Sequence, residues 1–169
     1  MALLPLGTAN NIARALGIGN DPKKAIRAWS KSHIMGFDVG RLLNVSGHRF
    51  FLEGFGFGVF PAMMTQMKKI GKSRGKSGGK NMNTALELLH TIVESYKPRH
   101  CKIVVDGKDH SGDYLLAEVM NIPSIGPNLC ISPGSDPGDG KFEVVLVGES
   151  DRQKAEEGHR SHGVTWRGR

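Results

Sequence analysis

The first residues whose types suggest chemistry lie in the opening segment LLPLGTANNIARALGI. Gly7 and Thr8 stand there just before an amphipathic helical pattern. A helix N-terminus has unpaired backbone N–H groups and a partial positive charge, so it can hold a phosphate group. Gly7 lets the backbone approach a ligand closely, and the Thr8 hydroxyl can bond either an anion or, as an N-cap, the helix itself. The residues alone leave both uses open.

Closely spaced carboxylates form a second candidate site in the segment SDPGDGK. Asp136 and Asp139 lie on a glycine-containing turn, and hard oxygen ligands of this kind suit Mg²⁺ or Ca²⁺. The same spacing is also typical of a turn without a ligand.

Basic residues form a third group. Six of them fall in one glycine- and serine-rich stretch that contains no acidic residue: Lys68, Lys69, Lys72, Arg74, Lys76 and Lys80. The whole chain has a formal net charge of +7. This stretch is either a solvated loop or a site for an anionic partner. Nucleic acid is not the expected partner, because the lysines are not interleaved with aromatic residues and no recognition motif is present.

Other patterns exclude several classes of protein. Cys101 and Cys130 have no CxxC or CxxH spacing, which argues against a disulfide framework or a zinc site and favours a reducing compartment. No apolar run reaches the roughly 18 residues of a spanning helix, so we expect a soluble or peripheral protein. The glycines of GFGFG lie in a strand pattern and open no helix, so they do not form a dinucleotide fingerprint.

The elements that carry these groups follow the order of helices first and strands afterwards. Thr8 and Gly17 bound a short helix, and Asp21 with Pro22 starts a second one that would bury Ile26 and Trp29. Strands joined by a hairpin follow, then one long helix at TALELLHTIVESY, then strands at KIVVDG, YLLAEVMNI and KFEVVLV. The last twenty residues have no sustained period.

Three segments resemble one family in its own order. LLPLGTANNIARALGI closely resembles the PLGTxND/N-type segment of the diacylglycerol kinase catalytic family, the lipid kinases that include bacterial diacylglycerol kinases and sphingosine kinases. DVGRL followed by FLEGFGFGV is similar to the family's strands after its inter-domain crossing. NIPSIGPNLCISPGSDPGDGKFEVVLV resembles the family segment N-x-G-x-x-(x)-I-x-P-x-A-x-x-D-D-G-x-x-D-V.

This resemblance implies an α+β fold in two parts. Residues 1–33 would be the helical end of an α/β nucleotide-binding domain. Residues 34–149 would form a mostly antiparallel, β-sandwich-like domain with one long helix. Residues 150–169 would be a disordered tail.

The resemblance also implies the nucleotide-site residues, with ATP between the two domains. Thr8 matches the family's ATP-contacting threonine, next to Gly7. Asn11 stands where many bacterial members have an aspartate tied to the metal network, and the change removes a charge. Lys69 and Arg74 fall near the family's basic residues that face the nucleotide phosphates.

A structural magnesium loop of bacterial members matches SDPGDGK. By that resemblance Asp139 supplies the side-chain ligand, and Asp136 and Lys141 supply backbone carbonyls. ATP and Mg²⁺ are therefore the expected cofactors.

Two catalytic segments of the family are not found in the 169 residues: the GGDGT phosphate loop and the acidic DGE-like segment. The catalytic acid is unassigned, and we expect the chain to be incomplete and inactive alone.

The expected function is transfer of the ATP γ-phosphoryl group to a lipid hydroxyl by a cytoplasmic kinase peripheral to a membrane. In sphingosine kinases the stretch after this strand carries an acidic residue that meets the amine of the sphingoid base. The corresponding stretch here, VFPAMMTQM, contains no acid, so the resemblance favours diacylglycerol as the acceptor. A kinase of another alcohol, sphingoid or soluble, and a non-catalytic binding module remain alternatives. A homo-oligomer is left open.

Overall fold

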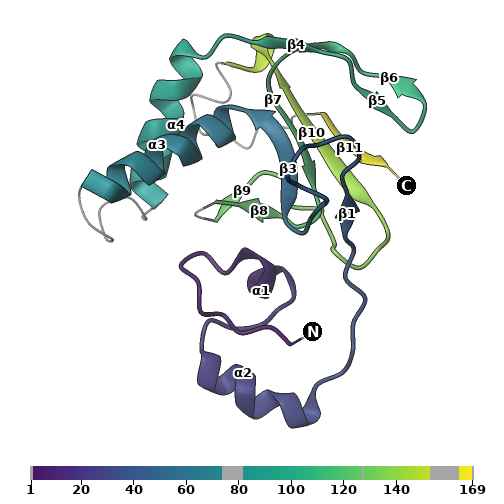
Figure 1. Ribbon diagram of the computed structural model, residues 1–169. Coiled ribbons are helices and arrows are strands. Elements are labelled where there is room, and N and C mark those ends of the chain that lie inside the picture. The colour runs from purple at the N-terminus through teal and green to yellow at the C-terminus, as the bar shows by residue number, and fades with distance from the viewer. Residues whose placement is uncertain (1, 74–81, 127, 153–163, 169) are drawn as a thin grey trace.

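The computed structural model describes residues 2–73, 82–126, 128–152 and 164–168 (Figure 1). The helices are α1 (Asn11–Ala15), α2 (Pro22–Ala28), α3 (Val59–Ser73) and α4 (Met82–Ser95), with 3-10 turns at Trp29–Lys31 and Glu149–Asp151. The strands are β1 (Gly40–Arg41), β2 (Phe50–Phe51), β3 (Gly54–Gly58), β4 (Arg99–Cys101), β5 (Val104–Val105), β6 (Lys108–Asp109), β7 (Gly112–Met120), β8 (Ser124–Ile125), β9 (Leu129–Cys130), β10 (Phe142–Gly148) and β11 (Val164–Gly168).

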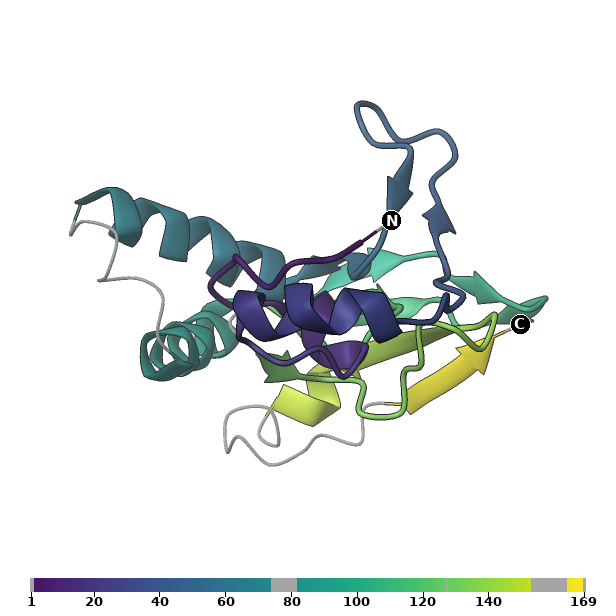
Figure 2. The same cartoon turned by 90° about the horizontal axis from the view of Figure 1, so that it is seen from below.

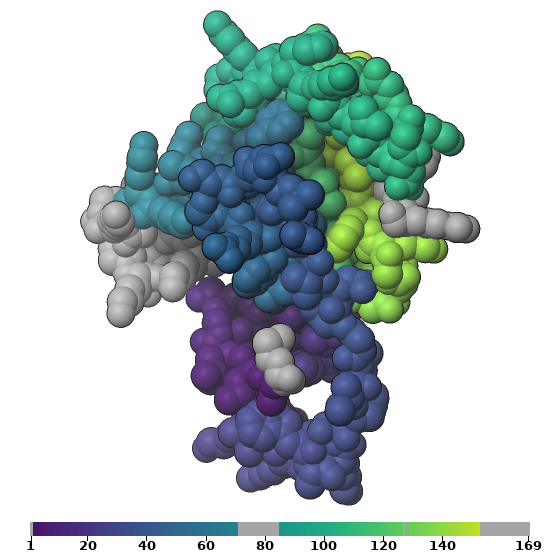
Figure 3. Space-filling model, turned by 45° about the vertical axis from the view of Figure 1, so that its right-hand side comes forward, coloured from purple at the N-terminus to yellow at the C-terminus, as the bar shows by residue number. Residues whose placement is uncertain are grey.

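The N-terminal helices form a small lobe below the rest of the molecule (Figures 1 and 3). Asp21 caps α2 as predicted: its Oδ1 accepts the backbone N–H groups of Lys23 at 2.9 Å and Lys24 at 3.3 Å. The predicted burial of Ile26 and Trp29 is wrong, because these side chains are 49% and 43% exposed. Among the described residues, the helix face that carries them packs on no second layer.

The main sheet lies in the second part of the chain and is antiparallel. Its strand order is β11-β10-β7-β3, and β4 pairs with β7 beyond the end of β3. The predicted hairpin is present as the β1–β2 pair, with Gly47 at a positive φ of 77° in the connection. This mixture of helices and an antiparallel sheet confirms the predicted α+β class.

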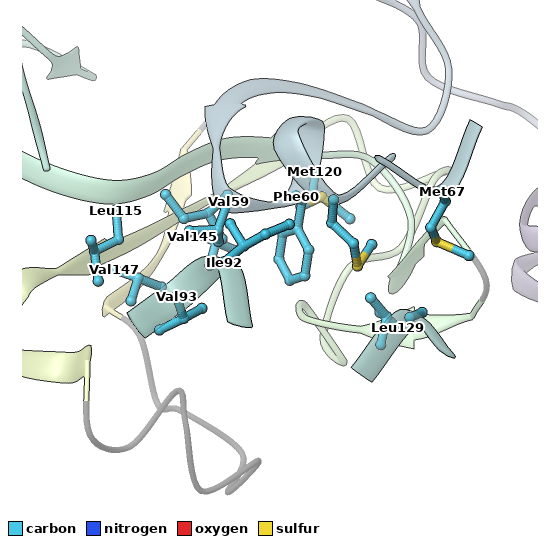
Figure 4. Close-up of a cluster of buried hydrophobic side chains, with 13 residues drawn as sticks. Val59, Phe60, Met67, Ile92, Val93, Leu115, Met120, Leu129, Val145 and Val147 are labelled. Atoms are coloured by element: carbon cyan, nitrogen blue, oxygen red, sulfur yellow. The ribbon is translucent and has the colours of Figure 1, made fainter. Parts of the chain in front are cut away.

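Helices α3 and α4 lie side by side and cover one face of the sheet (Figures 1 and 2). The main core fills the space between them and the sheet (Figure 4). Met63 is fully buried and Met67 is 8% exposed in this core, so these methionines pack the interior. A smaller apolar cluster includes Val144 and Leu146, which alternate along β10 with the main-core residues Val145 and Val147 and so lie on the opposite face of the sheet.

The prediction of one long helix is wrong, because α3 is a second one within the described part of the chain. Its buried side carries the methionines, while Lys68 and Lys69 are exposed on its surface. A basic stretch can therefore begin as the solvated face of an amphipathic helix. Arg74, Lys76 and Lys80 lie outside the described residues.

The C-terminal tail also differs from its prediction. Strand β11 lies within the 150–169 segment that was expected to be disordered, yet it pairs antiparallel with β10 over five residues. An open strand edge presents unpaired backbone groups that bind a further strand, and five residues are too few for a periodic pattern to be recognised.

Strand β3 approaches β7 very closely at its glycines. A Cβ on Gly56 would lie 2.1 Å from the backbone oxygen of Ala117, and a Cβ on Gly58 would lie 2.1 Å from the oxygen of Leu115. Glycine is needed here because no side chain fits between the two strands.

We expect Gly56→Ala to lower the free energy of unfolding by about 1–3 kcal/mol, because the added methyl group forces the strands apart. Urea denaturation measures the effect. Gly19→Ala is the matched control, since a Cβ there meets nothing within 4 Å. Equal stability of the two variants would contradict the close packing of β3 on β7.

Glu118 on β7 is an acidic residue inside the sheet. It is 3% exposed, and its Oε2 has no hydrogen-bond partner in the described part of the chain. Its direct neighbours across the strands are Gly56 and Val145. Burial raises the pKa of Glu118 to about 7, because the charged form loses its hydration.

The stability of the fold should consequently fall as the pH rises from about 4.5 to about 7. Over this range the unfolded chain releases the Glu118 proton while the folded chain still holds it, so the loss approaches about 3 kcal/mol above the folded pKa. Glu118→Gln should abolish this part of the pH dependence in urea titrations. Glu87→Gln, at an exposed position on α4, should leave it unchanged.

Candidate functional site

The candidate phosphate-binding segment folds around Asn10. Asn10 is the N-cap residue of α1 in a left-handed conformation, with φ 52°. Its Oδ1 accepts the backbone N–H of Gly7 at 2.8 Å. The cap is therefore Asn10, and the alternative role of Thr8 as the helix cap is wrong. Thr8 is exposed on the turn that this bond closes.

Asn11 joins the N-terminal lobe to the rest of the molecule. The side chain is 6% exposed, and its Nδ2 donates to the backbone oxygen of Gly126 at 3.0 Å. The same nitrogen lies 3.5 Å from Oε2 of Glu53. An aspartate could not make these contacts, because both partners are acceptors. The amide of Asn11 therefore suits this junction better than the aspartate that many bacterial members of the family have at this position.

Asn11 also has a polar atom without a partner. Its Oδ1 is buried and accepts no hydrogen bond within the described residues. A buried acceptor in this state costs free energy unless a ligand or water reaches it. The junction is therefore a place where a polar ligand would gain a hydrogen bond.

Glu53 is a candidate site residue that the sequence analysis missed. It precedes β3 directly and is half-buried beside Asn11. In the sequence, Glu53 is the acidic residue between the Phe50-Phe51 pair and GFGFG. The strand pattern around it predicts no function for an acidic residue there.

Asn121 fixes the position of Glu53. This side chain is fully buried, and its Nδ2 donates to the backbone oxygens of Asp38 at 2.8 Å and Leu52 at 2.9 Å. The backbone N–H of Asn121 donates to the oxygen of Glu53 at 2.9 Å. Three separate segments are thus joined at the end of β7.

The predicted magnesium loop is closed by its own hydrogen bonds. Oδ1 of Asp136 accepts the N–H of Gly138 at 3.0 Å, and Oδ1 of Asp139 accepts the N–H of Lys141 at 3.0 Å. The described ranges contain no group of three or more His, Cys, Asp or Glu side chains that could hold a metal ion. A site built from the Asp139 side chain and the backbone carbonyls of Asp136 and Lys141 therefore stays a prediction.

The loop instead supports the chain that enters the β-rich part. Asp38 accepts the N–H of Gly140 on Oδ2 at 2.8 Å and donates its own N–H to the oxygen of Pro137 at 2.6 Å. Below the loop, Glu143 accepts hydrogen bonds from the hydroxyls of Ser132 and Ser135. These Asx turns and their bonds to Asp38 therefore hold residues 32–39, the linker between the N-terminal lobe and the β-rich part.

Of the two basic residues predicted to face the nucleotide, the structure describes Lys69. Lys69 lines a groove with the end of β3 and with Tyr96 and Arg99, and no residue of the N-terminal lobe contributes to that groove. In Figure 1, α3 lies beside the upper part of the sheet, whereas α1 lies below the sheet. Arg74 lies outside the described residues. The structure thus brings Asn11 together with Glu53, and it places Lys69 in a groove with Arg99.

Two known family models match parts of the chain. A model of the diacylglycerol kinase catalytic domain matches residues 1–42, and a model of the YegS C-terminal NAD kinase beta sandwich-like domain matches residues 79–157. In this order the two matches place a catalytic-domain segment before a β-sandwich-like domain. The chain belongs to the diacylglycerol kinase family.

Individual relatives are distant. The chain is 26% identical over 147 residues to a probable lipid kinase YegS-like of Shewanella frigidimarina, covering 87% of this chain and 45% of that protein. It is 27% identical over 151 residues to diacylglycerol kinase of Bacillus subtilis, covering 87% and 46%. The chain thus spans about half the length of the curated relatives it matches.

Solved structures show the same fold. A diacylglycerol kinase structure from Bacillus anthracis str. Sterne superimposes with a TM-score of 0.64 at 20% identity, covering 95% of this chain and 52% of that one. A second structure from this organism gives a TM-score of 0.63 at 21% identity, covering 89% and 46%. Within the described residues, no helix is long and apolar enough to cross a bilayer.

Replacing the amide at the junction should loosen the N-terminal lobe. Asn11→Asp removes the donor to Gly126 and places a second carboxylate beside Glu53, at a cost of about 1–3 kcal/mol at neutral pH. Because the lobe can open locally, amide hydrogen exchange of residues 11–16 is the appropriate measurement. Adding Glu53→Gln should restore part of the protection. Unchanged exchange in Asn11→Asp would contradict the role of this contact.

Proposed function

We propose that the natural protein carrying this sequence is an ATP-dependent lipid kinase, with diacylglycerol as its acceptor. The contact of Asn11 with Gly126 and Glu53 is the observation that carries this proposal. It brings the PLGT segment, the start of β3 and the turn before β9 to one boundary. A kinase that binds ATP between two parts of the chain needs polar groups from both parts at such a boundary.

In this proposal the N-terminal turn binds the nucleotide. The Thr8 hydroxyl would bond a phosphate oxygen, and the bond from Gly7 to Asn10 would hold the turn in shape. When bound with ATP, Mg²⁺ would offset the charge of the phosphates. Asn11 and Glu53 would orient the turn against the β-rich part.

The acceptor assignment follows from what lies after β3. The first turn of α3 contains no acidic residue, so nothing there would pair with the amine of a sphingoid base. A neutral lipid hydroxyl fits this surface better. Such a substrate lies in a membrane, so we propose a cytoplasmic enzyme that works at the membrane surface.

The test is γ-phosphoryl transfer from labelled ATP by the natural protein, with dioleoylglycerol, sphingosine and glycerol as parallel acceptors. Diacylglycerol should be the preferred acceptor. Transfer to sphingosine or glycerol at a higher kcat/KM would replace this acceptor by the alternative alcohols. Transfer to none of them would favour the non-catalytic binding module.

Thr8→Ala should raise the KM for ATP about 5- to 30-fold while changing the KM for the lipid less. This factor corresponds to one lost hydrogen bond of about 1–2 kcal/mol. Thr91→Ala is the control, because Thr91 lies exposed on α4 and its hydroxyl donates to the oxygen of Glu87 in the same helix. A change confined to the lipid KM would put the nucleotide site elsewhere.

A further inference from the structure

Strand β3 leaves one edge of the main sheet open. It is the last strand in the order β11-β10-β7-β3, and within the described residues no further strand pairs with its outer side (Figure 1). Because the backbone N–H of Asn121 donates to the oxygen of Glu53, the antiparallel ladder directs the bonds of alternate residues, beginning at Phe55, toward β7. The N–H and C=O groups of Gly54 and Gly56 therefore point away from β7, to the open edge.

A groove with a volume of about 470 Å³ adjoins this edge. Gly56 lines it together with Pro61 and Lys69 of α3. The two α3 residues are eight positions apart, so the groove follows the helix for about 12 Å. An extended chain advances about 3.3 Å per residue, so this length takes about four residues. The other apolar side chains of the groove wall are Phe57, Ala62 and Tyr96.

The charge of the groove is entirely positive. Among the described residues, Lys69 and Arg99 are the charged ones that line it, and both are exposed. The ion pairs found in that part of the chain involve neither of them. An acidic ligand is therefore complementary to the groove. A second copy of this chain fits it less well, because each copy would bring the same two cations to the pairing edge.

The open edge offers acceptors as well as donors. A phosphate or carboxylate group has only acceptor oxygens, so it could bond the N–H of Gly56 but would leave the C=O of Gly54 without a donor. A peptide main chain supplies both kinds of group at the spacing of a strand. The same sheet already extends in this manner at its other end, where β11 pairs antiparallel with β10.

We propose that β3 binds an extended acidic segment of a partner protein as an added antiparallel strand. The main chain of the segment pairs with Gly54 and Gly56, and its carboxylates pair with Lys69 and Arg99. Apolar side chains at alternate positions of the segment contact the apolar wall of the groove. The inference does not depend on the proposed kinase chemistry, because neither ATP nor a lipid takes part.

The test measures the fluorescence anisotropy of a labelled heptapeptide of alternating glutamate and valine, titrated with the 169-residue chain at low and moderate salt. We expect saturable binding, and its absence would overturn the proposal. Lys69→Gln/Arg99→Gln should weaken binding at least tenfold. Lys68→Gln/Lys97→Gln is the matched control and should change binding less than twofold, because these neighbouring lysines are exposed and do not line the groove. Equal losses in the two double variants would reduce the effect to surface charge and overturn the proposal.

A second probe tests the added strand itself. The same heptapeptide with methylated backbone amides keeps every side chain and charge but cannot donate to the open edge, so it should bind at least tenfold more weakly. Equal binding of the two peptides would overturn strand addition, as would displacement of the unmethylated peptide by inorganic phosphate at equal concentration. Sedimentation of the chain alone is the last measurement: a dimer that the peptide dissociates would replace the acidic partner by a second copy. None of these outcomes bears on phosphoryl transfer, which is assayed separately.

Discussion

The arrangement of the whole molecule depends on one buried amide. Asn121 directly follows β7 and is buried, and its side chain donates to the backbone oxygens of Asp38 and of Leu52, which lies before β3. A buried donor that lost these partners would cost about 1–3 kcal/mol, so the linker and the strand are held in one register. With Glu53 fixed by the backbone of Asn121, the chain offers Asn11 a partner at a defined position. The N-terminal lobe is thus placed by polar bonds and not by a shared apolar core.

This division explains which elements could be predicted from the sequence. Asp21 before Pro22 and the glycine turn at Gly47 act within a few residues, so their local chemistry sufficed. The strand patterns around β7 and β10 were equally clear, because alternation and apolar runs report burial directly. The predicted burial of Ile26 and Trp29 was wrong, because an amphipathic pattern shows that a helix has an apolar face but not that a second layer covers this face.

The candidate site was only partly predictable for a related reason. Gly7 and Thr8 were found through a local motif, and the structure adds Asn10 as the residue that shapes their turn. Glu53 was missed because its importance arises from Asn11, which is 42 residues away in the chain. Lys69 was predicted from a basic stretch to face the nucleotide, and this stays a prediction; that α3 brings it beside Arg99 could not be read from the sequence. Non-local contacts of this kind leave no periodic signal.

The two buried carboxylates on the α3-covered face of the sheet show how the fold treats polar groups. Glu143 is directly opposite Met120, two positions along from Glu118, so both acidic side chains project to the same side. Glu143 accepts hydrogen bonds from the hydroxyls of Ser132 and Ser135 and thereby anchors the loop that supports Asp38. Glu118 lies against the glycines of β3, and burial raises its pKa to about 7. The carboxylate that accepts two hydroxyls thus helps to position the chain around Asp38, whereas the carboxyl with an unbonded oxygen lies in the sheet, where its cost in stability depends on pH.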